Sequence, residues 1–249
     1  MEIKGSAAIV TGGTGGLGRR ICRALAQAGA NVTLGYLKSK DLAEQLAAEY
    51  GALGVRVIPV QADITTQEGI DRMLGRTMEE FGRADILVNN AAYNRWIPYP
   101  DLETMTGEVW SHMIHYNLTS PFLAMRSAGP LMKRNGKGRI VNITSIAGLA
   151  PTGSSMAYAT SKAALIHLTR CMAVALAPEV LVNSVAPGLM EGTRMTANLA
   201  PEYVEASRRA TALKRAADKD DVADAALSLI RTDSITGQTL VVDAGKFYH

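Results

Sequence analysis

The stretch that decides the fold is Ala7-Ala-Ile-Val10 followed by Thr11-Gly-Gly-Thr-Gly-Gly-Leu-Gly18, after which a helical pattern begins. A strand that runs through a glycine-rich turn into a helix is typical of a pyrophosphate-binding unit. Glycine lets the backbone approach the ligand, and the helix N-terminus supplies unpaired N–H donors. A tight turn without a ligand is the alternative. Two glycine frames fit: G-x-G-x-x-G at Gly13, Gly15 and Gly18, or T-G-x-x-x-G-x-G at Gly12, Gly16 and Gly18.

Outward from this turn, short β-branched runs alternate with longer segments of helical period. The expected strands are Ala7–Val10, Val32–Leu34, Val55–Val60, Ile86–Val88, Arg139–Ile143, Val180–Val185 and Leu240–Val242. The expected helices are Gly16–Ala28, Asp41–Tyr50, Gln67–Phe81, Glu108–Lys133, Tyr158–Ala177 and Asp220–Ile230. The alternation predicts an α/β fold, a doubly wound seven-stranded parallel sheet with helices on both faces, in one domain over residues 1–249. The ligand is expected at the carboxyl edge of this sheet.

The composition excludes disorder, collagen-like repeats and a disulfide scaffold, because 47% of the 249 residues are hydrophobic and 20% are charged. The net charge of +3 is too small to indicate a nucleic acid partner. We expect no signal peptide, no membrane span and no metal site. Cys22 and Cys171 lie in helical patterns among apolar residues, so we expect both to be buried, reduced thiols of a cytoplasmic protein.

Two local features concern helix and loop structure. Asp41 followed by Glu44 predicts a capping box at a helix start. The least regular stretch is residues 188–215, and a long loop in a compact domain is usually a lid or a binding loop. We therefore expect a substrate lid there.

The strongest chemical signal is Tyr158-Ala-Thr-Ser-Lys162 at a predicted helix start. This spacing puts the phenol and the ammonium on one helix face, about 6 Å apart along the axis. A neighbouring cation favours the phenolate, so the pair can exchange a proton near neutral pH. Taken alone, an ordinary surface pair is the better interpretation. Ser145 favours a catalytic pair instead, because a hydroxyl just after the strand Arg139–Ile143 can orient a substrate oxygen at the ligand edge of the sheet.

Asn117 lies inside the expected helix Glu108–Lys133, where it is a poor helix former. Its side chain or a bound water can bend the helix there, and a solvated Asn is the alternative. Taken together, Asn117 and the motifs described above make the chain resemble the short-chain dehydrogenase/reductase family over essentially its whole length. The residues that carry the resemblance are Thr11-Gly12-x-x-x-Gly16-x-Gly18, Asp63, Asn89-Asn90-Ala91, Asn117, Ser145, Tyr158-x-x-x-Lys162 and Pro187-Gly188.

The resemblance implies a single-domain Rossmann fold, selects the second glycine frame, and implies a catalytic tetrad of Asn117, Ser145, Tyr158 and Lys162. Tyr158 would be the general acid/base, and Ser145 would position the carbonyl or hydroxyl. Lys162 would bind the nicotinamide ribose and lower the pKa of Tyr158. Asn117 would hold a water that leads protons from Lys162 to solvent.

The resemblance also implies the cofactor contacts. Asp63 would accept from the adenine amino group, and the further contacts would be Gly12, Thr14, Gly16, Leu17, Gly18, Ile64, Asn89, Ala91, Pro187, Gly188 and Met190. Tyr36 stands where NAD-preferring relatives carry an acid for the ribose 2′-OH. Lys38 and Ser39 can meet a 2′-phosphate, with a solvated Lys38 as the alternative. We therefore predict NADP(H), with NAD as the second option.

The reaction expected from this resemblance is hydride transfer between a ketone and a secondary alcohol. We expect a neutral carbonyl substrate of modest size, because the segments expected near the tetrad are mostly apolar or aromatic and Arg95 is the only charge beside them: Tyr93, Asn94, Trp96, Leu149–Met156 and Leu189–Leu199. Relatives are commonly homotetramers, so we expect a homotetramer with Phe247 and Tyr248 buried at a subunit contact.

Two other functions stay open. A 3-oxoacyl thioester reductase would need a basic docking patch, and a local cluster offers one, although a solvated face explains it as well: Arg126, Lys133, Arg134, Lys137 and Arg139. A regulatory sensor that binds NADP without turnover is the non-enzymatic alternative. The intact Ser145, Tyr158 and Lys162 weigh against a sensor.

Overall fold

A computed structural model describes residues 1–197 and 199–248 of the chain. In this part of the chain, seven strands form one parallel sheet in the order β3-β2-β1-β4-β5-β6-β7. The prediction of a seven-stranded parallel sheet is confirmed, with small shifts at the strand ends. The strands are β1 Ala7–Val10, β2 Asn31–Tyr36, β3 Val57–Gln61, β4 Ile86–Asn89, β5 Gly138–Ile143, β6 Val180–Pro187 and β7 Thr239–Val242.

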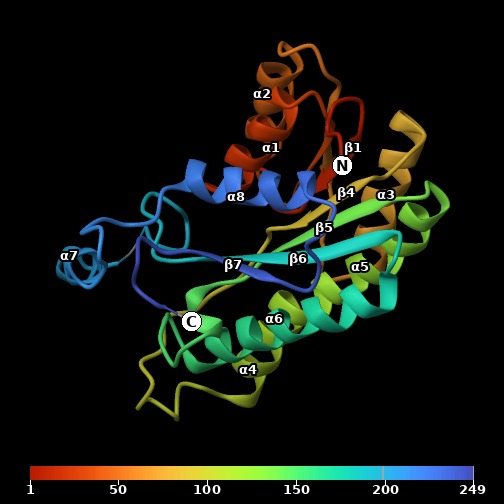
Figure 1. Cartoon of the computed structure of the whole chain (residues 1–249). Coiled ribbons are helices and arrows are strands. Elements are labelled where there is room, and N and C mark those ends of the chain that lie inside the picture. Colours follow the sequence, from red (N-terminus) through yellow and green to blue (C-terminus); the bar gives the residue numbers. More distant parts are fainter. Residues whose placement is uncertain (198, 249) are drawn as a thin grey trace.

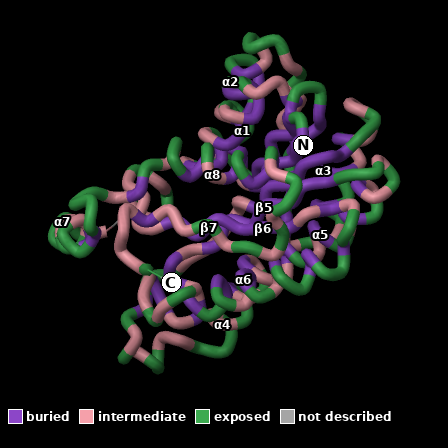
Figure 2. Tube along the Cα trace, viewed as in Figure 1, coloured by how far each residue is buried: buried purple, intermediate pink, exposed green. Residues whose placement is uncertain are grey.

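Helices cover both faces of the sheet, as predicted (Figure 1). One face packs against α1 Gly18–Gln27, α2 Lys40–Gly51 and α8 Lys219–Arg231. The other face packs against α3 Gln67–Phe81, α5 Ser120–Arg134 and α6 Met156–Leu176. The central strands are therefore buried from both sides (Figure 2), which explains their unbroken apolar runs.

The long helix predicted over Glu108–Lys133 is divided into three parts. α4 spans Gly107–Ile114, a π-helical turn η1 spans His115–Thr119, and α5 follows. Asn117 lies within η1. The expected distortion of the helix at Asn117 is therefore confirmed. Extra-wide turns of this kind are frequent at functional sites.

Two local predictions were wrong. The residues 188–215 are less irregular than expected, because α7 spans Pro201–Arg209. No capping box forms at Asp41, since α2 already begins at Lys40 and the N-cap Ser39 makes no side-chain hydrogen bond there. Asp41 instead lies in the first turn, where a carboxylate favours the positive end of the helix dipole.

The two cysteines differ in burial. Cys22 is fully buried in α1, as predicted, and this burial raises the pKa of its thiol. Cys171 is exposed, so the prediction that it is buried was wrong. On α6 the next two residues, Met172 and Ala173, face the core, and the helical repeat turns Cys171 away from it.

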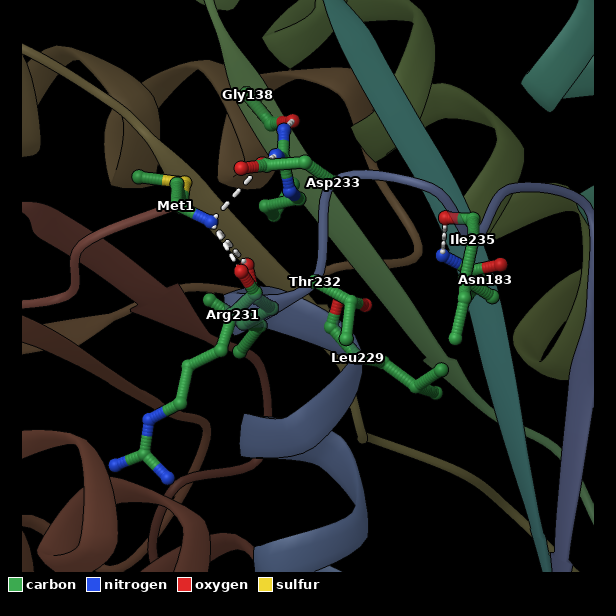
Figure 3. A network of polar contacts seen from close by, with 10 residues as sticks. Met1, Gly138, Asn183, Leu229, Arg231, Thr232, Asp233 and Ile235 are labelled. Carbon is green, nitrogen blue, oxygen red and sulfur yellow. Dashed lines mark hydrogen bonds and ion pairs between the residues drawn. The ribbon is translucent and has the colours of Figure 1, made fainter.

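At the amino end of the sheet, Arg139 is buried and pairs with Asp233. The same carboxylate lies 3.1 Å from the amino group of Met1, which also donates to the carbonyl of Arg231 (Figure 3). The buried Arg139 side chain is therefore committed to an ion pair with Asp233, whose own side chain is largely exposed. The assignment of Arg139 to an exposed basic cluster was wrong.

Among the described residues, no helix is both long enough and apolar enough to cross a membrane.

Candidate active site

The site lies at the carboxyl edge of the sheet, between β1 and β4, where the direction in which successive strands are added to the sheet reverses. The glycine-rich turn after β1 needs glycine at two positions in particular. Gly12 has a φ of +63°, and a Cβ on Gly18 would lie 2.2 Å from the carbonyl oxygen of Gly12. Gly18 belongs to both glycine frames, so the positive φ of Gly12 is the observation that favours the frame of Gly12, Gly16 and Gly18.

Two polar residues that the sequence reasoning left unassigned hold this turn against β4. Thr11 Oγ1 accepts hydrogen bonds from the N–H groups of Asn90 and Ala91 at 2.9 and 3.0 Å. Asn90 Nδ2 donates to the carbonyls of Thr11 and Gly12 at 2.9 and 3.1 Å. An Asn directly after a buried strand was the available signal. Asn89 is buried and donates to Asn142, so its side chain braces the sheet edge.

The donor groups at the start of α1 suit a pyrophosphate. Among the described residues, no acceptor is bonded to the N–H of Gly16 or Leu17. The N-cap Leu17 makes no side-chain cap, and the first turn carries no acidic residue. Free N–H groups and the positive end of a helix dipole form an anion site. These residues therefore fit the phosphates of a dinucleotide.

The other predicted cofactor residues lie along the same edge. Asp63 follows β3 and is exposed, with Oδ1 accepting from the N–H and hydroxyl of Thr65. Its second oxygen makes no hydrogen bond within the described residues. The remaining predicted contacts lie in the glycine turn or at the ends of β3, β4 and β6: Thr14, Ile64, Ala91, Pro187, Gly188 and Met190.

The end of β2 carries no carboxylate within residues 36–40. Tyr36 is buried, whereas Lys38 and Ser39 are exposed. Lys38 forms no ion pair in the described part of the chain. Its ammonium is therefore available for an anionic ligand at this strand end.

Ser145, Tyr158 and Lys162 are brought together by a close contact between two segments. The 3-10 turn η2, Ile146–Gly148, follows Ser145 and packs on α6, which carries Tyr158 and Lys162. A Cβ on Gly148 would lie only 2.7 Å from the backbone carbonyl carbon of Lys162. Ser145 Oγ accepts from the N–H of Ala147 at 3.1 Å, and its own proton can be donated to the Tyr158 oxygen or to a ligand.

The protonation states of the pair follow from burial. Lys162 is 2% exposed, and desolvation lowers its pKa to about 8, so the ammonium stays charged at neutral pH. Its Nζ donates to the carbonyl of Ile143 at 2.9 Å, and two donors remain. Burial raises the pKa of Tyr158 to about 12, although a side-chain hydrogen bond with Ser145 acts to lower it. Lys162 lies 5.7 Å from the Tyr158 ring centroid. That Lys162 lowers the pKa of Tyr158 stays a prediction.

Asn117 connects the π turn to the site through three hydrogen bonds. Its Oδ1 accepts from the N–H of Tyr93 at 2.8 Å, and its Nδ2 donates to the carbonyl of Tyr93 at 2.8 Å. Nδ2 also donates to Ser161 Oγ, which in turn donates to the carbonyl of Tyr158 at 2.7 Å. Asn117 thereby fixes both the loop after β4 and the first turns of α6.

The substrate pocket opens beside Ser145 and Tyr158. Its walls come from the segments expected from the sequence, although Tyr93 does not line it, and from α7, whose Tyr203 packs edge-to-face on Trp96 with ring centroids 5.1 Å apart. Arg95 does not line this pocket, whereas Lys246 does. The expectation that Arg95 is the only nearby charge was therefore wrong.

The fold and this site define a nicotinamide-dependent oxidoreductase of the Rossmann type. The family model described as short chain dehydrogenase matches residues 6–204. The chain belongs to the short-chain dehydrogenase/reductase family and is an oxidoreductase that acts on CH–OH and C=O groups.

Relatives and solved structures agree with this assignment. The chain is 39% identical to the granaticin polyketide synthase putative ketoacyl reductase 2 of Streptomyces violaceoruber, over 96% of this chain and 94% of the relative. It is 37% identical to the 3-oxoacyl-[acyl-carrier-protein] reductase of Synechocystis sp., over 96% and 95%. A 7α-hydroxysteroid dehydrogenase complexed with NADH and 7-oxo glycochenodeoxycholic acid superposes with a TM-score of 0.91 at 31% identity, over 98% of this chain and 95% of that one.

Proposed function

We propose that this protein is an NADP(H)-dependent reductase that converts a ketone to a secondary alcohol, with Tyr158 as the general acid. The observation that carries the proposal is the convergence of Ser145, Tyr158 and the buried Lys162 beside a largely neutral pocket at the dinucleotide edge. A sensor that binds NADP without turnover would not need this buried ammonium.

The bound nicotinamide supplies the hydride that reduces the carbonyl carbon. Ser145 donates its proton to the substrate oxygen and holds the carbonyl in place. Tyr158 keeps its proton at neutral pH and transfers it to the same oxygen as negative charge develops there. Lys162 stabilises the resulting phenolate, and its remaining donors bind the ribose hydroxyls. Asn117 would hold a water that leads protons from Lys162 to solvent.

The preference for NADP(H) rests on the end of β2. An exposed Lys38 with no ion-pair partner in the described residues, next to Ser39, suits a 2′-phosphate better than a 2′-hydroxyl. The similar structure of an NADPH-dependent 3-quinuclidinone reductase from Rhodotorula rubra supports the same choice, with a TM-score of 0.90 at 29% identity over 98% of this chain and 92% of that one.

Replacing Tyr158 by Phe tests the mechanism. We expect kcat for NADPH-dependent ketone reduction to fall by at least about a thousandfold, because the proton donor is lost. The Kd for NADPH, measured by fluorescence, should stay within about twofold of the wild-type value, since the ring remains. Turnover at the wild-type rate would refute the role of Tyr158.

A 3-oxoacyl thioester is the second candidate substrate, because both relatives described above are named as ketoacyl or 3-oxoacyl reductases. Because Arg139 is buried, four of the five clustered basic residues remain for a carrier docking surface. Comparing kcat/KM for a 3-oxoacyl thioester with that for simple ketones decides between these substrates.

We also propose that residues 188–215 act as a substrate lid and that the enzyme is a homotetramer. The lid proposal is supported by Gly192 and Thr193, which approach Gly16 so closely that a Cβ on Gly16 would lie 3.2 Å from both. The tetramer proposal is supported by Tyr248, which is 82% exposed in the single chain and is available for a subunit contact. Light scattering tests the tetramer. The cytoplasmic location stays a prediction.

A further inference from the structure

The substrate pocket contains one unbalanced charge. Of its lining residues in the described part of the chain, Lys246 alone is ionisable at neutral pH, and the others are apolar, aromatic or neutral polar residues. An ammonium surrounded by neutral walls attracts an anion more strongly than one in bulk water, because less solvent screens it. No carboxylate of the described lining residues competes for this position.

The position of Lys246 is fixed by the turn that carries it. Asp243 lies just after β7 and is buried, and its two carboxylate oxygens accept from the N–H groups of Gly245 and Phe247, each at 2.8 Å. The carbonyl of Gly245 accepts from the N–H of Ala212 at 3.0 Å. The backbone is thus held on both sides of Lys246. In Figure 1 this tail leaves the end of the sheet from which α7 projects.

Lys246 has no partner that would use its charge. Within residues 1–197 and 199–248 its Nζ makes no ion pair and no hydrogen bond, and it lies 6.0 Å from the centroid of the Phe247 ring. The carboxylate of Asp243 is already occupied by backbone donors. All three N–H donors of the Lys246 ammonium are therefore available to a ligand.

A second, independent feature of the same pocket points to a polar ligand atom. Ser154 lines the pocket and is 7% exposed, yet among the described residues its Oγ has no hydrogen-bond partner. Its carbonyl accepts from the N–H of Ile97 at 2.8 Å, so its backbone is anchored. Buried hydroxyls are nearly always bonded, because an unpaired one is costly. Ser154 is thus prepared to bond an atom that enters the pocket.

Resting on the proposed reductase function, we propose that the substrate is an oxo-compound that carries an anionic group, a carboxylate or a phosphate monoester, and that Lys246 binds this group. Ser154 hydrogen-bonds to a second oxygen of the substrate. The apolar body of the substrate packs on Trp96 and Tyr203, whose edge-to-face pair forms part of the pocket wall. The enzyme therefore selects charged oxo-compounds over neutral ketones of the same length.

Binding to the NADP⁺-loaded enzyme tests the anion site without turnover. Calorimetry compares hexanoate, hexyl phosphate and hexan-1-ol, which share one chain length. We expect at least one anion to bind about tenfold or more tightly than the alcohol. In Lys246→Met this preference should fall below about twofold. Lys4→Met, at an exposed lysine before β1, should keep it. The anion that binds more tightly identifies carboxylate or phosphate as the group.

Kinetics with a matched pair of ketones tests the consequence for the reaction. We expect kcat/KM for 6-oxoheptanoate to exceed that for its methyl ester about tenfold, and Lys246→Met to remove the difference while Lys246→Arg retains most of it. If the preferred anion is phosphate, the corresponding oxo-alkyl phosphate replaces the acid. Ser154→Ala should lower kcat/KM for the charged substrate about threefold to tenfold without changing the Kd for NADPH.

The two proposals fail in different ways. If the anion preference depends on Lys246 but no ketone is reduced, the reductase function is wrong and the anion site stands. If the ester and the acid are reduced equally in both wild type and Lys246→Met, the anion site is wrong and the reductase function stands. Equal affinity for the three hexyl probes, binding weaker than about 10 mM for all of them, or a preference that survives Lys246→Met also overturns the anion site.

Discussion

The contact between η2 and α6 predicts a large effect of one methyl group at Gly148. In Gly148→Ala the new Cβ would lie 2.7 Å from the backbone carbonyl carbon of Lys162 and 2.8 Å from the N of Ala163. Ordinary contacts begin at 3.4 Å, so the two segments must separate by about 0.7 Å. Both atoms belong to the backbone of a helix, and no flexible side-chain end can absorb the displacement.

This separation moves Ser145 relative to Tyr158, because the first residue precedes η2 and the second lies on α6. A misplacement of about 1 Å can cost about a hundredfold in rate. We therefore expect kcat of Gly148→Ala to fall by about tenfold to a hundredfold, with a smaller change in the Kd for NADPH. Overpacking should also lower the free energy of unfolding by about 1–3 kcal/mol, which corresponds to a Tm lower by roughly 2–10 °C.

Gly75→Ala is the matched control, because Gly75 lies inside α3 and a Cβ there would meet nothing within 4 Å. This variant should be more stable by about 0.5–1 kcal/mol, as expected for Gly to Ala inside a helix, with kcat unchanged. The assay is steady-state ketone reduction followed by NADPH absorbance, together with thermal unfolding. A Gly148→Ala enzyme with wild-type kcat and Tm would show that this contact does not position Ser145.

Three further predictions follow from charge and burial. Because burial lowers the pKa of Lys162 from 10.5 to about 8, its charge destabilises the folded protein below pH 8, and this cost disappears as the pH rises toward 10.5. Lys162→Met should therefore raise the free energy of unfolding at pH 7 by up to about 3 kcal/mol, and urea unfolding should show this gain shrinking from pH 8 to 10. Lys38→Ala should lower kcat/KM with NADPH by about tenfold to a hundredfold and leave that with NADH unchanged, since only the 2′-phosphate loses its partner; equal losses with both cofactors would contradict this. Cys171 should react with a thiol reagent in the native protein and Cys22 only after unfolding, as their exposure dictates; mass spectrometry locates the label, and native labelling of Cys22 would contradict the packing of α1.

The sequence predicted the elements whose patterns are local. β1 and α3 were predicted with their observed bounds, since an apolar run and a helical repeat each record the burial of one element. α7 was not predicted, because Ser207 is its one buried residue in the described structure and no apolar stripe marks it. The division of the helix at η1 depends on hydrogen bonds from Asn117 to Tyr93, a residue of another segment.

For the site, the sequence predicted which side chains converge but not what supports them. Ser145, Tyr158 and Lys162 were predicted together because their spacing matches a family pattern. Ser161 links Asn117 to the backbone of Tyr158 through hydrogen bonds at 3.2 and 2.7 Å, and no periodicity signals such a link. Lys246 enters the pocket from the far end of the chain, where its sequence neighbours say nothing about the pocket.

Arg139 shows why a run of like charges is a weak guide to a surface. Four of the five clustered basic residues lie on α5 or in the turn after it. Arg139 instead belongs to β5, and its side chain is buried. Its partner Asp233 is 94 positions away, and a buried guanidinium is tolerated only with such a partner. Lys246 is the converse, since the one acidic neighbour that could neutralise it is committed to backbone donors. A basic side chain thus serves structure or binding according to whether the fold brings a free carboxylate to it, and that depends on contacts between segments far apart in the sequence.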